Sequence, residues 1–267
     1  MDEKIGLEIE NLLQTNTFSF SRLNLFESCA FAWFLKYVVK IEQEDTLPLM
    51  LGKAVHKAIE MKMTGSEDKH ALLEGWKEVD FYPFDLVEYQ KLFSRANVTK
   101  GEANRPNVNV ELHFKLPLDT REGSPIIQGF IDVYQEVFST YSFTDWKSNR
   151  VMYDPLDTMQ LPLYAWAISE IYNVSSVTGT LFFLRFFKDN AKTMTFTEKH
   201  MKQARNWALE LAEQINSALK QYYLQDENLE KTFPPKPNKG CAHCPFAFTC
   251  VMNYPNIKNS EGVFASE

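Results

Sequence analysis

The clearest feature of the chain is a change in hydrophobic period near Asn107. From residue 108 to residue 114 every second residue is hydrophobic, and the residues between them are polar. A period of two predicts a β-strand with one polar face. Two further strand patterns follow at residues 126–137 and 141–146. We therefore expect three consecutive strands arranged as a meander.

These strands carry residues that could bind a metal ion or take part in catalysis. Asp132 lies in the second strand, and Asp145 and Lys147 lie two residues apart at the end of the third. Residues i and i+2 of a strand project from the same face, so a hairpin would bring all three side chains together. Two carboxylates and a lysine on one face are typical of a metal-dependent hydrolase. A solvated hairpin with a surface ion pair would show the same pattern.

Helical patterns precede the strands. Ser21 is a suitable N-cap for a long helix at residues 22–40, with Cys29 in the middle of its apolar stripe. A second helix is expected at residues 48–63, and the charged segment after it is most clearly helical at residues 84–96. Strands with helices on either side predict an α/β protein.

The second half of the chain continues this alternation. A turn is expected at residues 154–157, followed by a helix that ends near Tyr172. A strongly apolar strand at residues 177–187 could pair with residues 194–196, and Thr197 caps a long helix to Tyr223. The simplest interpretation of four phenylalanines in this strand is that they are core residues and not a base-stacking platform: Phe182, Phe183, Phe186 and Phe187.

Composition and charge exclude several classes of protein. The 267 residues suffice for one large domain or two small ones, and 45% of them are hydrophobic. No apolar run reaches the ~18 residues of a membrane span, and Met1–Lys4 lacks a signal core, so we expect a cytoplasmic protein, or one in the host cytoplasm if a virus encodes it. A net charge of −7 argues against a generally basic nucleic-acid coat. The sequence has no GxxxxGK loop, which argues against a motor.

The four cysteines form a further constellation. Cys241, Cys244 and Cys250 lie close together in sequence, and a fourth ligand would have to be Cys29 or His243. Four cysteines suit either zinc or a [4Fe–4S] cluster. Because zinc ribbons usually bring two short-spaced pairs, whereas this set is three plus one, we favour the iron–sulfur cluster.

Taken together, these motifs resemble the PD-(D/E)xK nuclease superfamily, and in particular its RecB/AddB-like branch and the CRISPR-associated iron–sulfur exonucleases. The resemblance covers roughly residues 19–253. The segments that carry it are Leu51–His56, Gly129–Asp132, Asp145–Lys147, Gln160–Tyr164 and the cysteines. It implies a restriction-endonuclease-like core, in which a mixed central β-sheet is flanked by helices, with an N-terminal helical region and a C-terminal iron–sulfur segment.

The resemblance also implies a role for each matching residue. Asp132 and Asp145 correspond to the family's metal-binding acids, and His56 to a further metal ligand. Lys147 corresponds to the lysine that orients or activates the attacking water. Gln160 and Tyr164 match the motif that lines the active site and contacts the DNA strand; Glu111, on the preceding strand, is a further candidate ligand. Ile131 replaces the proline of the literal motif, as is common in this branch.

The expected function is therefore a deoxyribonuclease dependent on Mg²⁺ or Mn²⁺. Such an enzyme would be an exonuclease on single-stranded DNA or DNA ends, with endonuclease activity open, in recombination, repair or CRISPR adaptation. Its partners would be DNA and helicase, recombination or CRISPR proteins, with no membrane and an oligomeric state that is left open. Two alternatives stand beside it: a non-catalytic iron–sulfur DNA-binding subunit of a larger complex, and a nuclease stabilised by zinc.

We expect residues 1–267 to form a single nuclease domain. Its parts would be a helical region at residues 19–106 with the first cluster cysteine, the core at 107–224 and the cysteine segment at 233–253. Basic residues that could follow a DNA strand are scattered, and each could equally be a solvated surface residue: Lys53, Lys57, Arg150, Arg185 and Lys188.

Overall fold

The computed structural model describes residues 3–254. The chain divides into two compact units, each built from segments that are distant in sequence. Unit 1 contains residues 1–44, 115–128 and 206–267, and unit 2 contains residues 45–114 and 129–205. The expected active-site residues all lie in unit 2, and all four cysteines lie in unit 1.

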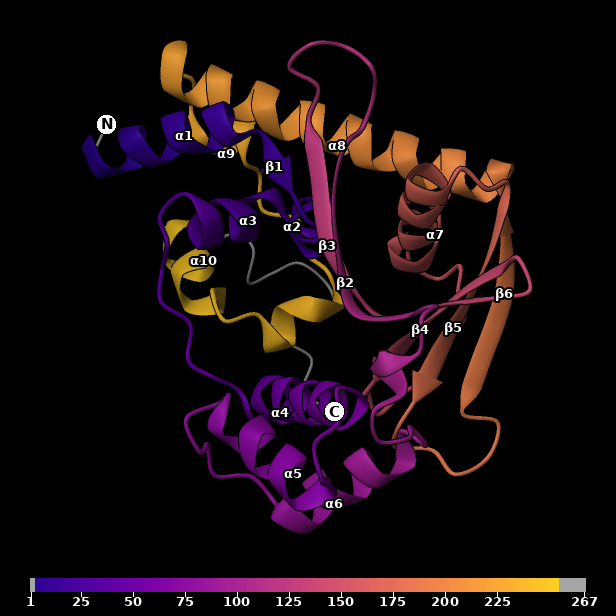
Figure 1. Ribbon diagram of the computed structural model, residues 1–267. Coiled ribbons are helices and arrows are strands. Elements are labelled where there is room, and N and C mark those ends of the chain that lie inside the picture. The colour runs from indigo at the N-terminus through magenta and orange to yellow at the C-terminus, as the bar shows by residue number, and fades with distance from the viewer. Residues whose placement is uncertain (1–2, 255–267) are drawn as a thin grey trace. The chain divides into compact units, whose positions relative to one another are not determined.

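Helices of unit 2 precede and interrupt its strands (Figure 1): α4 (Leu47–Met63), α5 (Asp68–Lys77), α6 (Leu86–Arg95), the short 3₁₀ helix η1 (Glu102–Asn104) and α7 (Gln160–Tyr172). Helix α4 carries apolar residues on one face, and they are buried from Met50 to Met63. Gly75 of α5 lets the two helices approach closely, because a Cβ there would lie 2.4 Å from the carbonyl oxygen of Ala54.

The strands form a mixed sheet in the order β1-β3-β4-β5-β6, with β2 paired to β3. Their bounds are β1 (Thr17–Phe18), β2 (Val108–Pro117), β3 (Ile126–Val137), β4 (Thr140–Lys147), β5 (Ser176–Phe183) and β6 (Ala191–Thr197). Strands β3 and β4 are antiparallel, β4 and β5 are parallel, and β5 and β6 are antiparallel. Helix α7 provides the crossover that the parallel pair requires.

The expected α/β fold with a mixed sheet flanked by helices is confirmed, and the three consecutive strands pair as neighbours, β2 with β3 and β3 with β4. The strand expected at residues 177–187 is shorter than predicted, and the assignment of its phenylalanines to the core is wrong for Phe187. Strand β5 ends at Phe183, and only that phenylalanine of the four is fully buried. Phe182 and Phe186 are half-buried, whereas Phe187 lies in the loop after the strand and is 84% exposed. The apolar residues continue from the strand into the loop after it, so hydrophobicity alone did not show where the strand ends.

Unit 1 contains the remaining helices and β1 (Figure 1). They are α1 (Glu3–Thr15), α2 (Phe20–Ser28), α3 (Ala30–Tyr37), the larger part of α8 (Glu198–Leu224), α9 (Leu229–Thr232), the 3₁₀ helix η2 (Lys239–His243) and α10 (Ala247–Asn253). Strand β1 pairs in parallel with the first residues of β3. The core of unit 1 is aromatic. Trp33 stacks on Phe233 with ring centroids 6.0 Å apart, and Phe34 packs against the same Phe233 ring.

The long helix expected at residues 22–40 is in fact two helices. The chain is extended at Cys29 (φ −162°, ψ 105°), which is both the C-cap of α2 and the N-cap of α3. The N-cap of α2 is Ser19 instead of Ser21, and its hydroxyl accepts a hydrogen bond from the amide of Arg22. Hydrophobic spacing persisted through the break, so the pattern alone did not reveal it.

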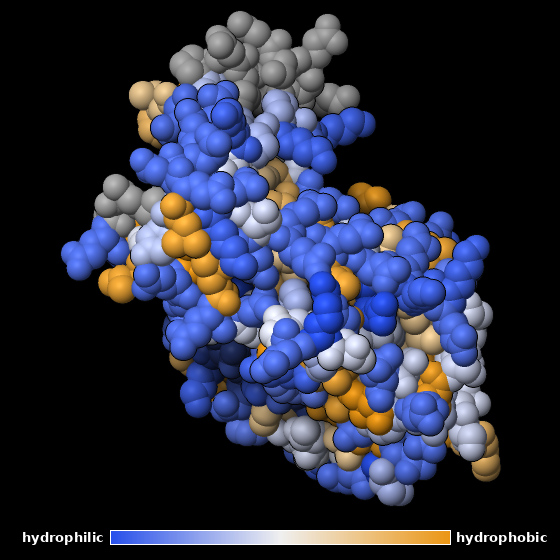
Figure 2. All heavy atoms as spheres, turned by 90° about the horizontal axis from the view of Figure 1, so that it is seen from above, coloured by the Kyte–Doolittle hydropathy of each residue, from blue (hydrophilic) through white to orange (hydrophobic). Residues whose placement is uncertain are grey.

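The surface is ordinary for a globular protein. The face in Figure 2 is mostly hydrophilic, with hydrophobic side chains in small separate groups. Across residues 3–254, no helix is both long enough and apolar enough to cross a membrane.

Candidate active site

The β3–β4 hairpin brings Asp132 and Asp145 together as the strand pattern predicts. Val133 pairs with Thr144, so the two acids occupy the next positions along the hairpin. The backbone amide of Trp146 donates a 2.7 Å hydrogen bond to Oδ2 of Asp132. Both aspartates are buried, with 8% and 3% of their surface exposed. Two buried carboxylates side by side are costly unless a cation offsets their charge, which excludes the solvated-hairpin interpretation.

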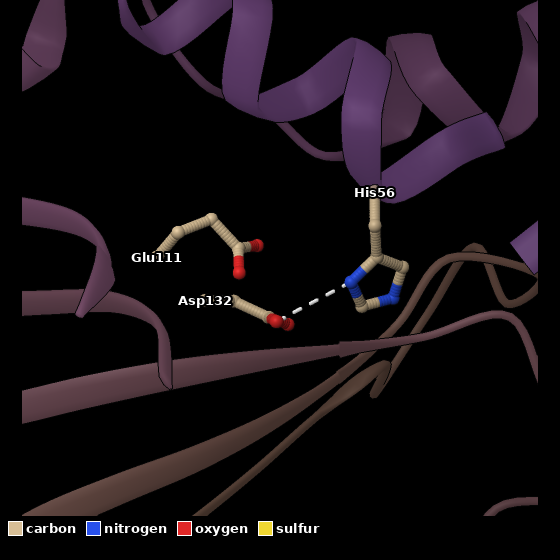
Figure 3. Close-up of side chains that lie close together, drawn as sticks. All are labelled: His56, Glu111 and Asp132. Carbon is tan, nitrogen blue, oxygen red and sulfur yellow. Dashed lines mark ion pairs between the residues drawn. The ribbon is translucent and has the colours of Figure 1, made fainter. Parts of the chain in front are cut away.

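Helix α4 directs His56 at the same carboxylate (Figure 3). Nδ1 of His56 lies 3.3 Å from Oδ1 of Asp132. The two oxygens of Asp132 therefore have different partners, a backbone amide and an imidazole. The helix holds the histidine because its opposite face is buried among apolar side chains of unit 2.

Glu111 of β2 completes a group of three potential metal ligands. One ligand atom each from His56, Glu111 and Asp132 lie within 4.8 Å of one another. Glu111 has a positive φ of 52°, which is uncommon for a residue other than glycine inside a strand. Such a left-handed residue redirects a side chain in the way that a β-bulge does beside active sites. The backbone of β2 thus adopts an unfavourable conformation at the residue that reaches the histidine and the aspartate.

Lys147 begins a chain of polar contacts on the other side of Asp145. Its Nζ lies 2.5 Å from Oδ2 of Asp145 and donates a 2.8 Å hydrogen bond to Oε1 of Gln160. Nε2 of Gln160 donates in turn to the hydroxyl of Tyr164 over 3.1 Å. Gln160 and Tyr164 share a face of α7 because they are four residues apart. The helix therefore fixes the position of the lysine through the glutamine.

The negative charge of Asp132 raises the pKa values of three neighbouring groups in this site. Burial acts to lower the pKa of His56, but the charge and hydrogen bond of Asp132, assisted by Asp145, raise it to about 9. Burial and the charge of Asp132 raise the pKa of Glu111 to about 7. Burial and Asp132 likewise raise the pKa of Asp145 to about 6 against the opposing effect of Lys147. Carboxylates that hold protons near neutral pH are typical of an acidic site built for a cation.

The two remaining charged groups behave differently. Burial acts to raise the pKa of Asp132, but the charge and hydrogen bond of His56 and the amide of Trp146 keep it below its ordinary value. Burial acts to lower the pKa of Lys147, but Asp145, Tyr153 and Asp132 raise it above its ordinary value. Asp132 is therefore the permanent anion of the site, and Lys147 is its permanent cation.

Tyr153 is a neighbour of Lys147 that the sequence analysis did not identify. Burial raises the pKa of its phenol, while the charge of Lys147 and a hydrogen bond with it act in the opposite direction. The ring also packs edge-on against Phe183, with centroids 5.3 Å apart. Tyr153 lies in an irregular segment six residues after Lys147, where neither strand nor helix periodicity relates the two side chains.

A second constellation lies entirely within unit 1. Cys29, Cys241, Cys244 and Cys250 line one cavity of about 300 Å³, and all four are free thiols. Two backbone amides donate to their sulfurs, from Lys236 to Cys29 at 3.5 Å and from Asn238 to Cys241 at 3.4 Å. Burial, followed by the other three cysteines, raises the pKa of Cys250 to about 11.

The spacing of these sulfurs does not match a single tetrahedral ion. Zinc–sulfur bonds of 2.3 Å would place the sulfurs about 3.8 Å apart. Within the part of the chain that the structure describes, no three of the cysteine sulfurs approach one another within 4.8 Å. The four thiols therefore share a cavity without forming a compact group of ligand atoms.

The comparisons with known proteins identify a family. A family model described as the PD-(D/E)XK nuclease superfamily matches residues 17–251, which is most of the chain. No curated protein matches. A solved structure described as SSO0001 has 16% sequence identity and covers 91% of this chain and 95% of its own. Its TM-score of 0.38 is too low to support a structural argument.

Proposed function

The chain belongs to the PD-(D/E)XK nuclease superfamily, and on this premise we propose that it is a Mg²⁺- or Mn²⁺-dependent deoxyribonuclease that acts as an exonuclease on single-stranded DNA or DNA ends. Membership by itself implies a metal-dependent nuclease. The observation that carries the metal dependence is the convergence of His56, Glu111 and Asp132 within 4.8 Å, next to the Asp145–Lys147 pair, whereas the preference for single strands and DNA ends rests on the resemblance of the sequence motifs.

The donor set suits a divalent ion. His56, Glu111 and Asp132 would hold it, with Asp145 beside them. Oxygen donors alone suit Mg²⁺, and an imidazole favours a transition metal such as Mn²⁺. When bound, such an ion neutralises phosphate charge and lowers the pKa of coordinated water.

The protein's own residues supply a fixed positive charge. The charge of Asp145 raises the pKa of Lys147 above its ordinary value against the effect of burial, so in this structure the lysine is a charged hydrogen-bond donor. Its ammonium group is held between Asp145 and Gln160, where it would stabilise negative charge that develops on a phosphate. Gln160 and Tyr164 orient the lysine and form the wall of the site on α7.

The cysteines of unit 1 would hold a [4Fe–4S] cluster. In support, four thiols line one cavity, and two backbone amides donate hydrogen bonds to two of their sulfurs. The cluster would join Cys29 to a segment about 210 residues later, which by loop-closure entropy contributes about 5 kcal/mol. Its proposed role is structural.

We further propose that the chain belongs to the RecB/AddB-like branch and is similar in role to the CRISPR-associated iron–sulfur exonucleases. Its substrate ends would then come from a helicase or from recombination, repair or CRISPR proteins in the cytoplasm. The support for this proposal is the order of motifs in the sequence from Leu51–His56 to Gln160–Tyr164, together with the one-plus-three cysteines.

The test is an assay with the purified full chain and end-labelled single-stranded DNA. We expect degradation with Mn²⁺ or Mg²⁺ and none with excess chelator. Lys147→Ala should reduce the rate at least ~100-fold, because it removes an electrostatic contact to the reacting phosphate. Lys192→Ala, which removes an exposed lysine of β6, is the matched control. Binding of DNA without cleavage in every divalent metal would instead identify a non-catalytic DNA-binding subunit.

A further inference from the structure

The loop between β5 and β6, residues 184–190, carries an exposed aromatic ring close to the active site. Phe187 is 84% exposed. The two residues after it, Lys188 and Asp189, are also exposed and are polar. An isolated aromatic residue among charged neighbours is unlike the contiguous apolar patches by which proteins usually dock to one another.

Hydrogen bonds fix this loop to the strand that carries the proposed catalytic lysine. The amide of Leu184 donates a 2.9 Å hydrogen bond to the carbonyl oxygen of Lys147. Nε of Arg185 donates to the carbonyl oxygen of Ser148 over 2.6 Å, and its guanidinium is paired with Glu88. The loop is therefore held in one position beside the end of β4.

Arg95 of α6 braces the loop and covers one face of the phenylalanine ring. Its Nη1 donates to the carbonyl oxygens of Leu184 and Arg185 over 3.2 and 2.8 Å. Its guanidinium carbon lies 5.0 Å from the centroid of the Phe187 ring, which is cation–π distance. With Arg95 on one face and 84% of the residue exposed, the other face of the ring is open to a ligand.

The ring lies within a few nucleotides of the proposed reaction site. Lys147 pairs with Phe183 across the parallel strands, which are about 4.8 Å apart. Phe187 lies four positions after Phe183, and four steps of extended chain span at most about 14 Å. Phe187 is thus no more than about 19 Å from Lys147 along the backbone path.

We propose that Phe187, with Arg95 against its ring, is a stacking site for one unpaired base of single-stranded DNA next to the cleavage site. The proposal rests on the proposed function only in taking DNA as the substrate. Every base has a π-face, so aromatic stacking binds a strand without sequence preference. The cations at Arg95 and Lys188 would attract the neighbouring phosphates. Duplex DNA offers no unstacked base, so the site discriminates in favour of single strands and frayed ends.

Binding of fluorescein-labelled dT₁₂ to the full chain, measured by anisotropy in chelator without divalent metal, tests this site. Phe187→Ala should weaken binding about 5- to 150-fold, which corresponds to 1–3 kcal/mol for one stacked base. Phe187→Trp should restore it, and Phe187→Leu, which keeps an apolar contact but no π-face, should not. Phe138→Ala, which removes another exposed phenylalanine (96%) from the β3–β4 turn, should bind like the wild type.

A series of dT₁₂ oligonucleotides with one abasic site each provides the decisive comparison. In the wild type, one abasic position should weaken binding; in Phe187→Ala the same position should have no further effect. The stacking site would be overturned if Phe187→Ala lost as much affinity for capped duplex DNA as for dT₁₂. It would also be overturned if Phe187→Ala bound dT₁₂ like the wild type, and the exposed ring would then be assigned to contact with a protein partner. The anisotropy assay measures binding and does not require cleavage. If the wild type failed to degrade DNA in the separate activity assay, the proposed nuclease function would be refuted, but the binding data would still test the stacking site.

Discussion

At the scale of single residues, the candidate metal site is defined by the protons it holds when no metal is bound. His56, with a pKa of about 9, and Glu111, with a pKa of about 7, both face the permanent anion Asp132. A metal ion binds only the deprotonated forms of these ligands, so metal and protons compete for the same atoms. The site should consequently bind its ion more tightly as pH rises.

This competition gives a prediction for Mn²⁺ binding between pH 6 and 9. From pH 7 to pH 9 the apparent affinity should rise about tenfold per unit, because binding displaces one proton from His56. Below pH 7 the slope should steepen as Glu111 also becomes protonated. Calorimetry in buffers of different ionisation enthalpy measures the affinity and the released protons together.

His56→Ala should bind Mn²⁺ more weakly and lose the slope between pH 7 and pH 9. His70→Ala, which removes an exposed histidine of α5, is the matched control and should leave the slope unchanged. The metal-free wild type should also lose stability as pH rises from about 6.5 to about 9. The pKa of His56 is higher in the folded than in the unfolded protein, so His56 stabilises the fold while it is protonated and this contribution is lost when it deprotonates. A wild-type affinity independent of pH would contradict the assignment of His56 as a ligand.

Residue periodicity predicted part of the site and not the rest. The i, i+2 rule placed Asp145 and Lys147 together, and the structure confirms their ion pair. By pattern alone, His56 was an ordinary helix residue and Glu111 one of several polar strand residues; both became candidates through the family resemblance. Tyr153 and Phe187 were missed because they lie in irregular segments, where no period relates sequence position to space.

At the scale of elements, the prediction succeeded where packing and pattern agree. The limits of β3 were anticipated as residues 126–137, and the helix holding Gln160 and Tyr164 was anticipated from the turn before it and from Pro162, which is tolerated in the first turn of a helix. The break at Cys29 was not, because both α2 and α3 continue the apolar stripe. The interruption depends on the extended backbone conformation of one residue, Cys29, and the pattern of hydrophobic and polar residues does not report the conformation of a single residue.

Gly179 of β5 is the position at which the sheet is most sensitive to one added carbon. A Cβ there would lie 2.5 Å from Cζ of Phe143 and 2.8 Å from the ring of Phe196. Both rings are buried and cannot move away freely. Gly179→Ala should therefore destabilise the protein by about 1–3 kcal/mol through overpacking, which urea denaturation can measure.

The neighbouring residue of the same strand provides the control. Thr178→Ala removes only an exposed hydroxyl contact with Thr195 and should change stability by no more than about 0.5 kcal/mol. Equal stability of the wild type and Gly179→Ala would show that the rings of Phe143 and Phe196 can separate. In that case the close packing of β4, β5 and β6 would not hold Asp145 and Lys147 in place as firmly as the structure indicates.

At the scale of the whole molecule, the chain assigns its two candidate inorganic sites to different compact units and builds them from different donor atoms. The oxygen and nitrogen donors belong to unit 2, and the four thiols belong to unit 1. Hard divalent ions prefer the first set and iron–sulfur clusters the second, so one protein can hold both without exchange. With a net charge of −7, bound cations also reduce the repulsion between the protein and DNA.

This separation predicts that the cysteine site can be removed without removing the acidic one. Cys250→Ser should abolish the absorption band near 400 nm that the family resemblance implies, reduce iron content and lower the thermal midpoint, because unit 1 loses its cross-link between distant segments. Calorimetric Mn²⁺ binding by the remaining folded protein should persist, since His56, Glu111 and Asp132 all lie in unit 2.

Val251→Ala, which alters the wall of the same cavity without removing a thiol, should retain both iron and the absorption band. A colourless wild type that contains zinc would refute the cluster, although the sulfurs would then have to move closer together than the structure shows. Loss of Mn²⁺ binding in folded Cys250→Ser would refute the independence of the two sites. Iron analysis and Mn²⁺ calorimetry on the same two variants therefore separate the stabilising role of the cysteines from the metal chemistry of the acidic site.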